Sequence, residues 1–272
     1  MGFGCCLARS LVPRLCQGPA PLTRRPSPLV FERLAEAYRA RPGYPEALVR
    51  RLLALVPPSA RVVDLGAGTG HLAEPLARAG ARVHAVEPSQ AMLAVCAERT
   101  RGLGVRLVHA PAESTGLPSA SAELVVLADA AQWVDPEAAG AEAHRLLEDG
   151  GTAATVQPRP LDTPFMRALE ALLRRANPER RPQGPGRGRQ WLALASGGAT
   201  VRTVEFNHSV ALSRPELEAV LRSLSFLAPA LGPARMTSLV AEAQALAHQH
   251  GGARWERVLR LSWAKRRREK RG

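Results

Sequence analysis

A glycine-rich loop flanked by two acidic residues is the feature of the sequence with the clearest chemical meaning. Asp64 belongs to a short apolar run, the loop Gly66-Ala67-Gly68-Thr69-Gly70 follows it, and Glu87 ends a second apolar run. Glycines allow the backbone to approach a ligand closely and to adopt positive φ angles. A helix that begins at such a loop offers its free amide donors to the same ligand. An acid about 20 residues further on can accept the hydroxyl protons of a ribose, so Glu87 is the predicted ribose contact.

The spacing of the glycines separates two classes of cofactor. A nicotinamide-dinucleotide loop has the pattern G-x-G-x-x-G, whereas this loop reads G-A-G-T-G and has His71 at the position of the third glycine. Asp64 suits a cofactor with a cationic ammonium group and would fit poorly beside a pyrophosphate. The loop therefore favours a cofactor with a cationic group. The alternative is that Asp64 only caps backbone amides of the turn.

The segments around these residues alternate between strands and helices. Apolar runs bounded by turn residues predict strands at 61–65, 82–86, 105–109, 122–127 and 152–156. Helical spacing of apolar residues predicts helices at 30–38, 44–56, 71–78, 90–100 and 136–147. This alternation is typical of an α/β protein in which helices cover both faces of a parallel sheet.

The second half of the chain is less regular. It predicts a helix at 163–176, a loop at 177–189, a strand at 200–212, helices at 215–227 and 233–250, and a last strand at 255–263. We expect a domain at 29–266, with its core at 60–157 and a lid and acceptor region at 158–250. Residues 1–28 are expected to be a disordered extension and 267–272 a basic tail.

Three stretches of the sequence resemble the ordered motifs of class I S-adenosylmethionine-dependent methyltransferases. They are VVDLGAGTGHLAEPLA at 62–77, VHAVEPSQAML at 83–93 and AAQWVDPEAAGAEAHRLLEDGG at 130–151. The segment Tyr38-Arg39-Ala40-Arg41-Pro42-Gly43-Tyr44-Pro45 is similar to that of a subgroup with a methyltransferase type 11 domain, which resembles trans-aconitate methyltransferase. The resemblance implies a Rossmann-like class I methyltransferase fold with a mostly parallel seven-stranded sheet and a helical lid or insertion. It also implies S-adenosyl-L-methionine as cofactor and a small-molecule acceptor.

The resemblance assigns cofactor contacts position by position. Asp64, Gly66 and Gly68 would contact the methionine part, and Glu87 the ribose. Pro111 stands where the subgroup commonly has an aspartate, so adenine recognition would rest on backbone groups or be weaker. The cofactor residues implied in this way are Tyr38, Arg41, Asp64, Gly66, Gly68, Glu87, Met92, Ala112, Glu113 and Ala128.

The residues implied for catalysis are Tyr38, Gln132 and Trp133. The subgroup usually has a histidine at the position of Gln132, and a glutamine side chain cannot act as a general base near pH 7. A carboxylate acceptor needs no base, so Gln132 and the nearby arginines favour a carboxylate. Trp133 is either a wall of the acceptor pocket or a packing residue at the sheet edge.

The charge of the chain raises a rival function. The formal net charge is +13, carried by arginines spread along the sequence, since Lys265 and Lys270 are the only lysines. A basic surface suits an RNA or DNA methyltransferase. However, the sequence has no Asn-Pro-Pro-Tyr or Asp-Pro-Pro-Tyr tetrad and no Pro-Cys motif. Nucleic acid is therefore the disfavoured partner. A non-catalytic module that binds S-adenosylmethionine is a second alternative.

The cysteines, the apolar runs and the first 28 residues bear on metal binding and on the location of the protein. The cysteines Cys5, Cys6, Cys16 and Cys96 have neither zinc-site spacing nor a disulfide framework, so we expect a reducing compartment and no metal. The sequence has no apolar run long enough for a membrane span. We therefore expect a cytoplasmic protein without membrane contact. A mitochondrial location is the alternative if residues 1–28, which lack acidic residues, are a transit peptide.

Overall fold

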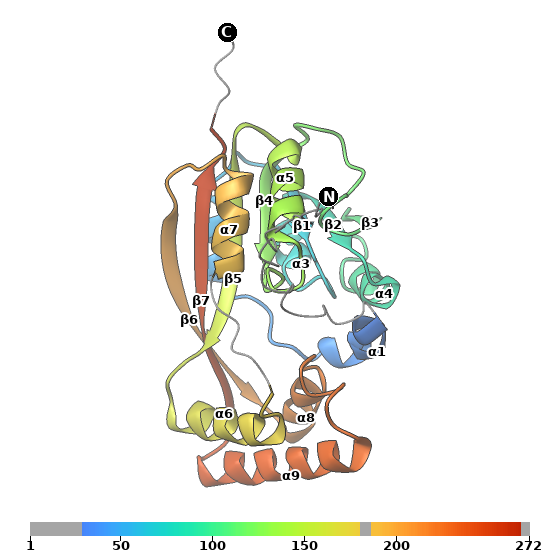
Figure 1. The fold of residues 1–272 in the computed structure, drawn as a ribbon, viewed down its shortest axis with the longest axis vertical. Coiled ribbons are helices and arrows are strands. Elements are labelled where there is room, and N and C mark those ends of the chain that lie inside the picture. Colours follow the sequence, from blue (N-terminus) through green and yellow to red (C-terminus); the bar gives the residue numbers. More distant parts are fainter. Residues whose placement is uncertain (1–28, 180–185, 268–272) are drawn as a thin grey trace, which may run out of the picture.

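The computed structural model describes residues 29–179 and 186–267 (Figure 1). The expected extension at 1–28 and all but the first residue of the expected tail at 267–272 lie outside the described residues. Within the described part of the chain, no helix is long and apolar enough to cross a membrane.

A seven-stranded sheet forms the centre of the molecule. The strand order is β3-β2-β1-β4-β5-β7-β6, in which β1 to β5 run parallel and β7 is antiparallel to both β5 and β6. This confirms the predicted fold, a mostly parallel sheet covered by helices. The strands are β1 (Arg61–Leu65), β2 (Arg82–Glu87), β3 (Arg106–His109), β4 (Ala122–Ala128), β5 (Leu147–Pro160), β6 (Arg202–Leu212) and β7 (Ala253–Lys265).

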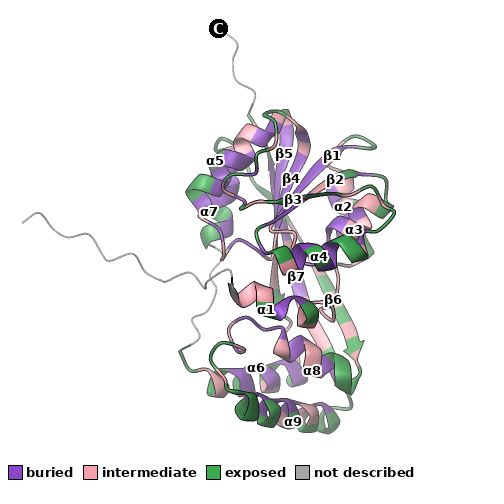
Figure 2. Cartoon of the chain, turned by 90° about the vertical axis from the view of Figure 1, so that its right-hand side faces the viewer, coloured by how far each residue is buried: buried purple, intermediate pink, exposed green. Residues whose placement is uncertain are grey.

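Nine helices are described, and they form three groups. The helices are α1 (Leu29–Tyr38), α2 (Glu46–Leu53), α3 (Ala73–Arg78), α4 (Gln90–Arg99), α5 (Pro136–Leu146), α6 (Pro164–Ala176), α7 (Gly186–Ala195), α8 (Arg214–Arg222) and α9 (Pro233–Gln249). Helices α5 and α7 cover one face of the sheet, and α2, α3 and α4 lie on the other side (Figure 2). Helices α6, α8 and α9 form a separate layer below the sheet (Figure 1).

The two faces of the sheet bury separate cores because side chains alternate along a strand. In β1, Val62 packs with the α2 and α3 side, whereas Val63 and Leu65 pack with the α5 and α7 side. All three side chains are almost fully buried. Strands buried on both faces carry consecutive apolar residues, which is why this part of the sequence predicted the sheet correctly.

The long strands connect the sheet to the lower helical layer. Strand β5 has 14 residues and β7 has 13, so both extend beyond β1 to β4 and reach α6. The buried side chains of α6, α8 and α9 form a third core with the start of β7. A carboxyl-edge site can therefore be enclosed between the sheet and this layer.

The prediction of a loop at 177–189 was wrong for residues 186–189, which begin α7; residues 180–185 lie outside the described residues. Trp191 and Leu192 of α7 are almost fully buried against the rest of the core. Gly140 permits this contact, because a Cβ atom there would lie 2.7 Å from Leu194 Cβ. Tertiary packing thus outweighs the poor helix propensity of the Pro-, Gly- and Arg-rich sequence. The expected lid region at 158–250 consequently contributes to two layers.

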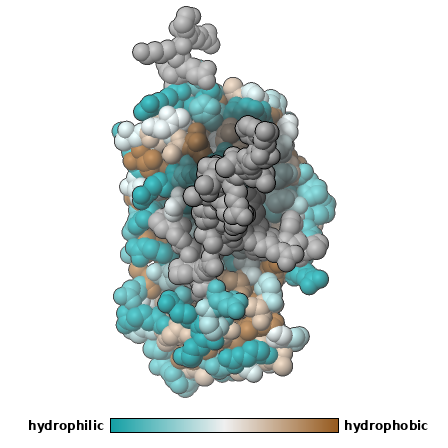
Figure 3. Space-filling view, in the orientation of Figure 1, coloured by the Kyte–Doolittle hydropathy of each residue, from teal (hydrophilic) through white to brown (hydrophobic). Residues whose placement is uncertain are grey.

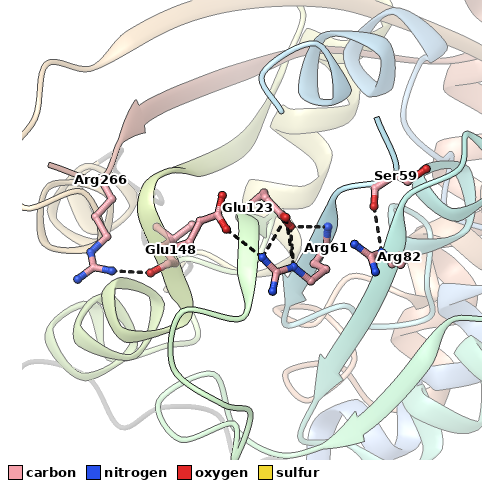
Figure 4. A network of polar contacts seen from close by, with 7 residues as sticks. Ser59, Arg61, Arg82, Glu123, Glu148 and Arg266 are labelled. Atoms are coloured by element: carbon pink, nitrogen blue, oxygen red, sulfur yellow. Dashed lines mark hydrogen bonds and ion pairs between the residues drawn. The ribbon is translucent and has the colours of Figure 1, made fainter. Parts of the chain in front are cut away.

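Charged residues occupy the amino-terminal edge of the sheet. The backbone amide of Arg61 donates to Glu123 Oε2 at 2.7 Å, and its guanidinium Nη2 donates to Glu148 Oε2 at 2.9 Å. Arg266 from the end of the chain lies in the same row (Figure 4). These contacts join β1, β4 and β5 at the edge opposite the glycine loop, and leave the carboxyl edge to the site.

Candidate active site

A cavity of about 330 Å³ lies at the carboxyl ends of β1, β2 and β4. Its other walls come from α1, from the residues 38–45 that follow it (below, the arm), and from α6 and α8. Ligands of open α/β sheets bind at this edge of the sheet. Every residue predicted for the site lines this one cavity: Tyr38, Arg41, Asp64, Gly66, Gly68, Glu87, Met92, Ala112, Glu113, Ala128, Gln132 and Trp133.

The glycine loop adopts the positive φ angles expected from its sequence. Gly66 has φ +65° and Gly68 has φ +57°, a region that favours glycine. A Cβ atom on Gly66 would lie 2.8 Å from the Ala130 side chain. The amide of Gly68 donates to Glu87 Oε2 at 2.9 Å, and that of Ser89 donates to Glu87 Oε1 at 3.0 Å. Glu87 is thereby fixed between the loop and the start of α4.

The carboxylate of Asp64 is the most unusual polar group of the cavity. It is 1% exposed, and its Oδ2 atom has no hydrogen-bond partner. Burial, and then the charge of nearby Glu87, raise the pKa of the Asp64 carboxyl to about 8. A buried carboxylate without a partner is costly unless a ligand compensates it. Capping of backbone amides alone leaves Asp64 Oδ2 without a partner, and the contact of Asp64 with a cationic ligand group stays a prediction.

Arg41 connects the arm to two other parts of the molecule. Its guanidinium carbon lies 3.9 Å from the centroid of the Tyr38 ring. Its Nε donates to Ser223 Oγ at 2.9 Å and its Nη2 to the Ser223 carbonyl oxygen at 3.0 Å, at the end of α8. Its Nη1 lies 3.6 Å from Asp129 Oδ2. Burial raises the pKa of the Tyr38 hydroxyl, which stays protonated as a hydrogen-bond donor.

Asp129 is a cavity residue that the sequence prediction did not include, although it named the neighbouring Ala128. Asp129 has φ +51°, one of three positive values among the non-glycine residues described. Its amide donates to the Val156 carbonyl at 2.8 Å, and its own carbonyl accepts from Gln132 Nε2 at 2.9 Å. These two bonds hold the unfavourable backbone conformation. Burial raises the pKa of the Asp129 carboxyl, while Arg41 and Arg257 oppose this effect.

Arg257 is a second cavity residue absent from the prediction. It reaches the arm from β7, and its Nη2 donates to the carbonyl oxygens of Pro42, at 2.7 Å, and Gly43. Its Nε donates to His208 Nδ1 at 3.3 Å. Arg257 is separated from the arm by more than 200 residues, and its strand predicted only alternating packing, so no local signal marked it.

The remaining predicted residues close the cavity. Trp133 packs edge to face on Phe31 of α1, with ring centroids 5.1 Å apart, and also lines the cavity. Its role toward an acceptor stays a prediction. Met92 and Ala112 are buried, as expected for an apolar wall. Glu113 Oε1 accepts the amide of Asp135 at 2.7 Å, which directs this carboxylate toward the start of α5.

The cavity changes character toward the lower helical layer. There its walls are mainly hydrocarbon, and the residues that contribute are Met166, Leu169, Leu173, Val220, Leu224, Phe226 and Trp255. Among the residues with described positions, no group of His, Cys, Asp or Glu side chains is arranged to hold a metal ion.

Comparison with known proteins agrees with this geometry. Residues 63–155 match a family model described as a methyltransferase domain. This stretch is similar to a methyltransferase domain. It contains the glycine loop, Glu87 and Gln132, and the arm and the lower helical layer lie outside it. The trans-aconitate subgroup remains a resemblance of the sequence.

Relatives and solved structures show how far the similarity extends. An uncharacterized methyltransferase of Mycobacterium tuberculosis is 39% identical over 135 residues, covering 49% of this chain and 54% of the relative. The chain therefore spans about half the length of that relative. A malonyl-[acyl-carrier protein] O-methyltransferase of Methylococcus capsulatus is 35% identical over 113 residues, covering 40% and 41%. The structure of a putative type II methyltransferase of Anaeromyxobacter dehalogenans, 23% identical, has a TM-score of 0.56 and covers 84% of this chain and 99% of that one. It shows the same Rossmann-like fold.

Proposed function

We propose that the protein transfers a methyl group from S-adenosyl-L-methionine to the carboxylate of a small molecule. The observation that carries the proposal is the buried, unpartnered Asp64 carboxylate beside the glycine loop, inside a stretch that matches a methyltransferase domain. A carboxylate in this position favours a ligand with a cationic group over a dinucleotide.

The residues present fit this cofactor. Asp64 would accept its ammonium group, the loop at Gly66 and Gly68 would lie against its methionine part, and Glu87 would accept the ribose hydroxyls. Met92 and Ala112 would form the apolar walls of the adenine pocket, beside Glu113 and Ala128. The cofactor, when bound, supplies an electrophilic methyl group on a cationic sulfur.

The acceptor end of the cavity favours an anion. Two guanidinium groups, those of Arg41 and Arg257, lie near one acidic group, that of Asp129. One positive charge is left over, and an anionic acceptor would neutralise it. Gln132 can orient an acceptor by hydrogen bonding, and Tyr38 can donate to it. A carboxylate is already nucleophilic, so none of these residues has to remove a proton. The name of the O-methyltransferase from Methylococcus capsulatus is consistent with an oxygen acceptor.

The protein's contribution to the rate is alignment and exclusion of water. Trp133 on Phe31 and the arm on Ser223 enclose the cavity. Enclosure strengthens the electrostatic contacts inside and holds the acceptor in one orientation, which can account for several kcal/mol of the barrier.

Calorimetry tests the cofactor. Titration with S-adenosylmethionine and S-adenosylhomocysteine should show binding, and NAD should not bind. The Glu87→Gln variant should bind both sulfur ligands roughly 10- to 100-fold more weakly, because it loses charge-assisted hydrogen bonds. Glu46→Gln, on the surface of α2 with 80% of its side chain exposed, is the matched control and should bind as the wild type does. If the folded wild type binds neither sulfur ligand, the proposal is wrong.

A further inference from the structure

The lower half of the cavity is apolar and belongs to no part of the cofactor site. Its walls come from α6 and α8, and the buried side chains there include Leu169, Val220 and Leu224. Leu224 is the most accessible of these three, at 8% exposed. A wall of this kind recognises hydrocarbon, because burial of apolar surface drives binding.

The charged groups near this half are engaged with the protein. Glu256 Oε2 accepts from Thr163 Oγ1 at 2.7 Å, and Arg159 Nη2 lies 3.2 Å from Glu205 Oε2. Glu170 of α6 also lines the cavity, and its Oε1 lies 3.6 Å from Arg174 Nη2. These acidic and basic groups thus have partners outside the cavity. The hydrocarbon surface between them offers a ligand little besides apolar contact.

The apolar half is directly joined to the cationic centre of the site. Arg41 binds both the hydroxyl and the carbonyl of Ser223, and the next residue, Leu224, lines the apolar half. A side-chain hydrogen bond with the neighbouring Ser225 lowers the pKa of the Tyr38 hydroxyl, against the larger effect of burial. A molecule whose anionic end lies at Arg41 therefore has its other end against Leu224.

We propose that the acceptor is an aliphatic monocarboxylic acid, with its carboxylate between Arg41 and Arg257 and its hydrocarbon chain in the half of the cavity lined by α6 and α8. This inference rests on the proposed function and makes it more specific. Asp129 adds selectivity, since its carboxylate repels a second negative charge on the acceptor.

Chain length provides the test. Each methylene group that enters the apolar half should improve binding roughly fourfold, until the chain outgrows the space. The probes are butanoate, hexanoate, octanoate and decanoate, titrated by calorimetry into the full-length protein saturated with S-adenosylhomocysteine. Succinate serves as the dianionic comparison for butanoate.

Two substitutions of one residue separate cavity filling from damage to the fold. Leu224→Phe should weaken the binding of octanoate and decanoate by about tenfold or more and leave butanoate nearly unchanged. Leu224→Ala should move the optimum toward longer chains. Val201→Phe, at a residue before β6 that is 41% exposed and does not line the cavity, is the control and should change none of the constants. The ratio of long-chain to short-chain affinity does not depend on the fraction of folded protein.

The outcomes separate the two proposals. Affinity that rises with chain length, together with the opposite effects of the two Leu224 variants, supports the inference. Equal affinity for all four acids, or tighter binding of succinate than of butanoate, overturns it and leaves the methyltransferase proposal standing. Absence of acid binding also overturns it. Only absence of S-adenosylhomocysteine binding would overturn both.

Discussion

At the scale of single residues, Asp64 links function to stability. Its carboxyl group is buried beside the glycine loop without a partner for Oδ2, so the ionised form of this group destabilises the folded protein. Functional sites commonly contain such groups, since a ligand compensates the cost that the empty protein bears. The pKa of about 8 implies that the free protein holds this carboxyl protonated through the neutral range.

Asp64→Asn should stabilise the protein at alkaline pH. The pKa of Asp64 is raised in the folded state, so the folded protein binds one more proton than the unfolded chain between about pH 4 and pH 8. The free energy of unfolding of the wild type therefore falls as the pH rises through this window. The variant lacks this loss and should exceed the wild type by a few kcal/mol at pH 8.5, and by little at pH 4.

Urea denaturation at both pH values measures this difference. The same variant should lose S-adenosylmethionine binding, because an amide cannot replace the carboxylate beside an ammonium group. A variant that is less stable than the wild type at alkaline pH would show that the Asp64 carboxylate is not destabilising.

Arg41→Lys should raise the KM for the acceptor about tenfold. A lysine ammonium cannot contact both atoms of Ser223, stack on the Tyr38 ring and remain near Asp129. Arg33→Lys on the exposed surface of α1 is the control. Steady-state kinetics with a carboxylic acid acceptor measures the change, and an unchanged KM would remove Arg41 from the acceptor site.

At the scale of elements, the sequence predicted the sheet well because its strands are buried runs of β-branched and aliphatic residues between turn residues. It predicted the glycine loop and Glu87 for the same reason, since both lie at the ends of such strands. It missed the start of α7, which depends on the contact of Leu194 with Gly140. It also missed Arg257, whose partners Pro42 and Gly43 are brought near only by the folded chain.

The turn before β4 allows a test of backbone strain. Ala120 is exposed and has φ +50°, and its amide donates to the Arg145 carbonyl at 2.9 Å. Ala120→Gly should raise the free energy of unfolding by about 0.5–1 kcal/mol, because the left-handed conformation costs an L-residue about 1–2 kcal/mol and glycine little.

The matched control is Ala141→Gly, at an exposed position inside α5, which should lower the free energy of unfolding by about 1 kcal/mol. Thermal or urea denaturation measures both variants. If both substitutions destabilise the protein equally, the conformation at residue 120 carries no strain.

At the scale of the whole molecule, the cavity lies between a rigid sheet and a separate helical layer. The arm joins the two through Arg41 and Ser223, and through Arg257 of β7. Among the described residues, arginines pair with acids on several elements, and hydrophilic residues are scattered over the face drawn in Figure 3. This pattern does not favour the long basic groove that nucleic-acid binding requires.

A ligand between the two layers should stabilise the whole fold. S-adenosylmethionine at 100 times its Kd should raise the free energy of unfolding by about 2.7 kcal/mol. For a chain of this size the corresponding rise in Tm is about 5–10 °C. Differential scanning fluorimetry measures the shift, with Asp64→Asn as the variant that should show none. A shift of equal size with NAD would contradict the cofactor assignment.

Methyl transfer to a carboxylate is measured most directly by following the methyl group itself. The protein is incubated with S-adenosylmethionine labelled in its methyl group and with octanoate, and the organic product is then treated with alkali. We expect labelled product that alkali converts to volatile labelled methanol, as a methyl ester requires. At a cofactor concentration near the Kd of the wild type, the Glu87→Gln variant should transfer much less label. Label in an alkali-stable product, or no transfer by a protein that binds the cofactor, would contradict methyl transfer to a carboxylate.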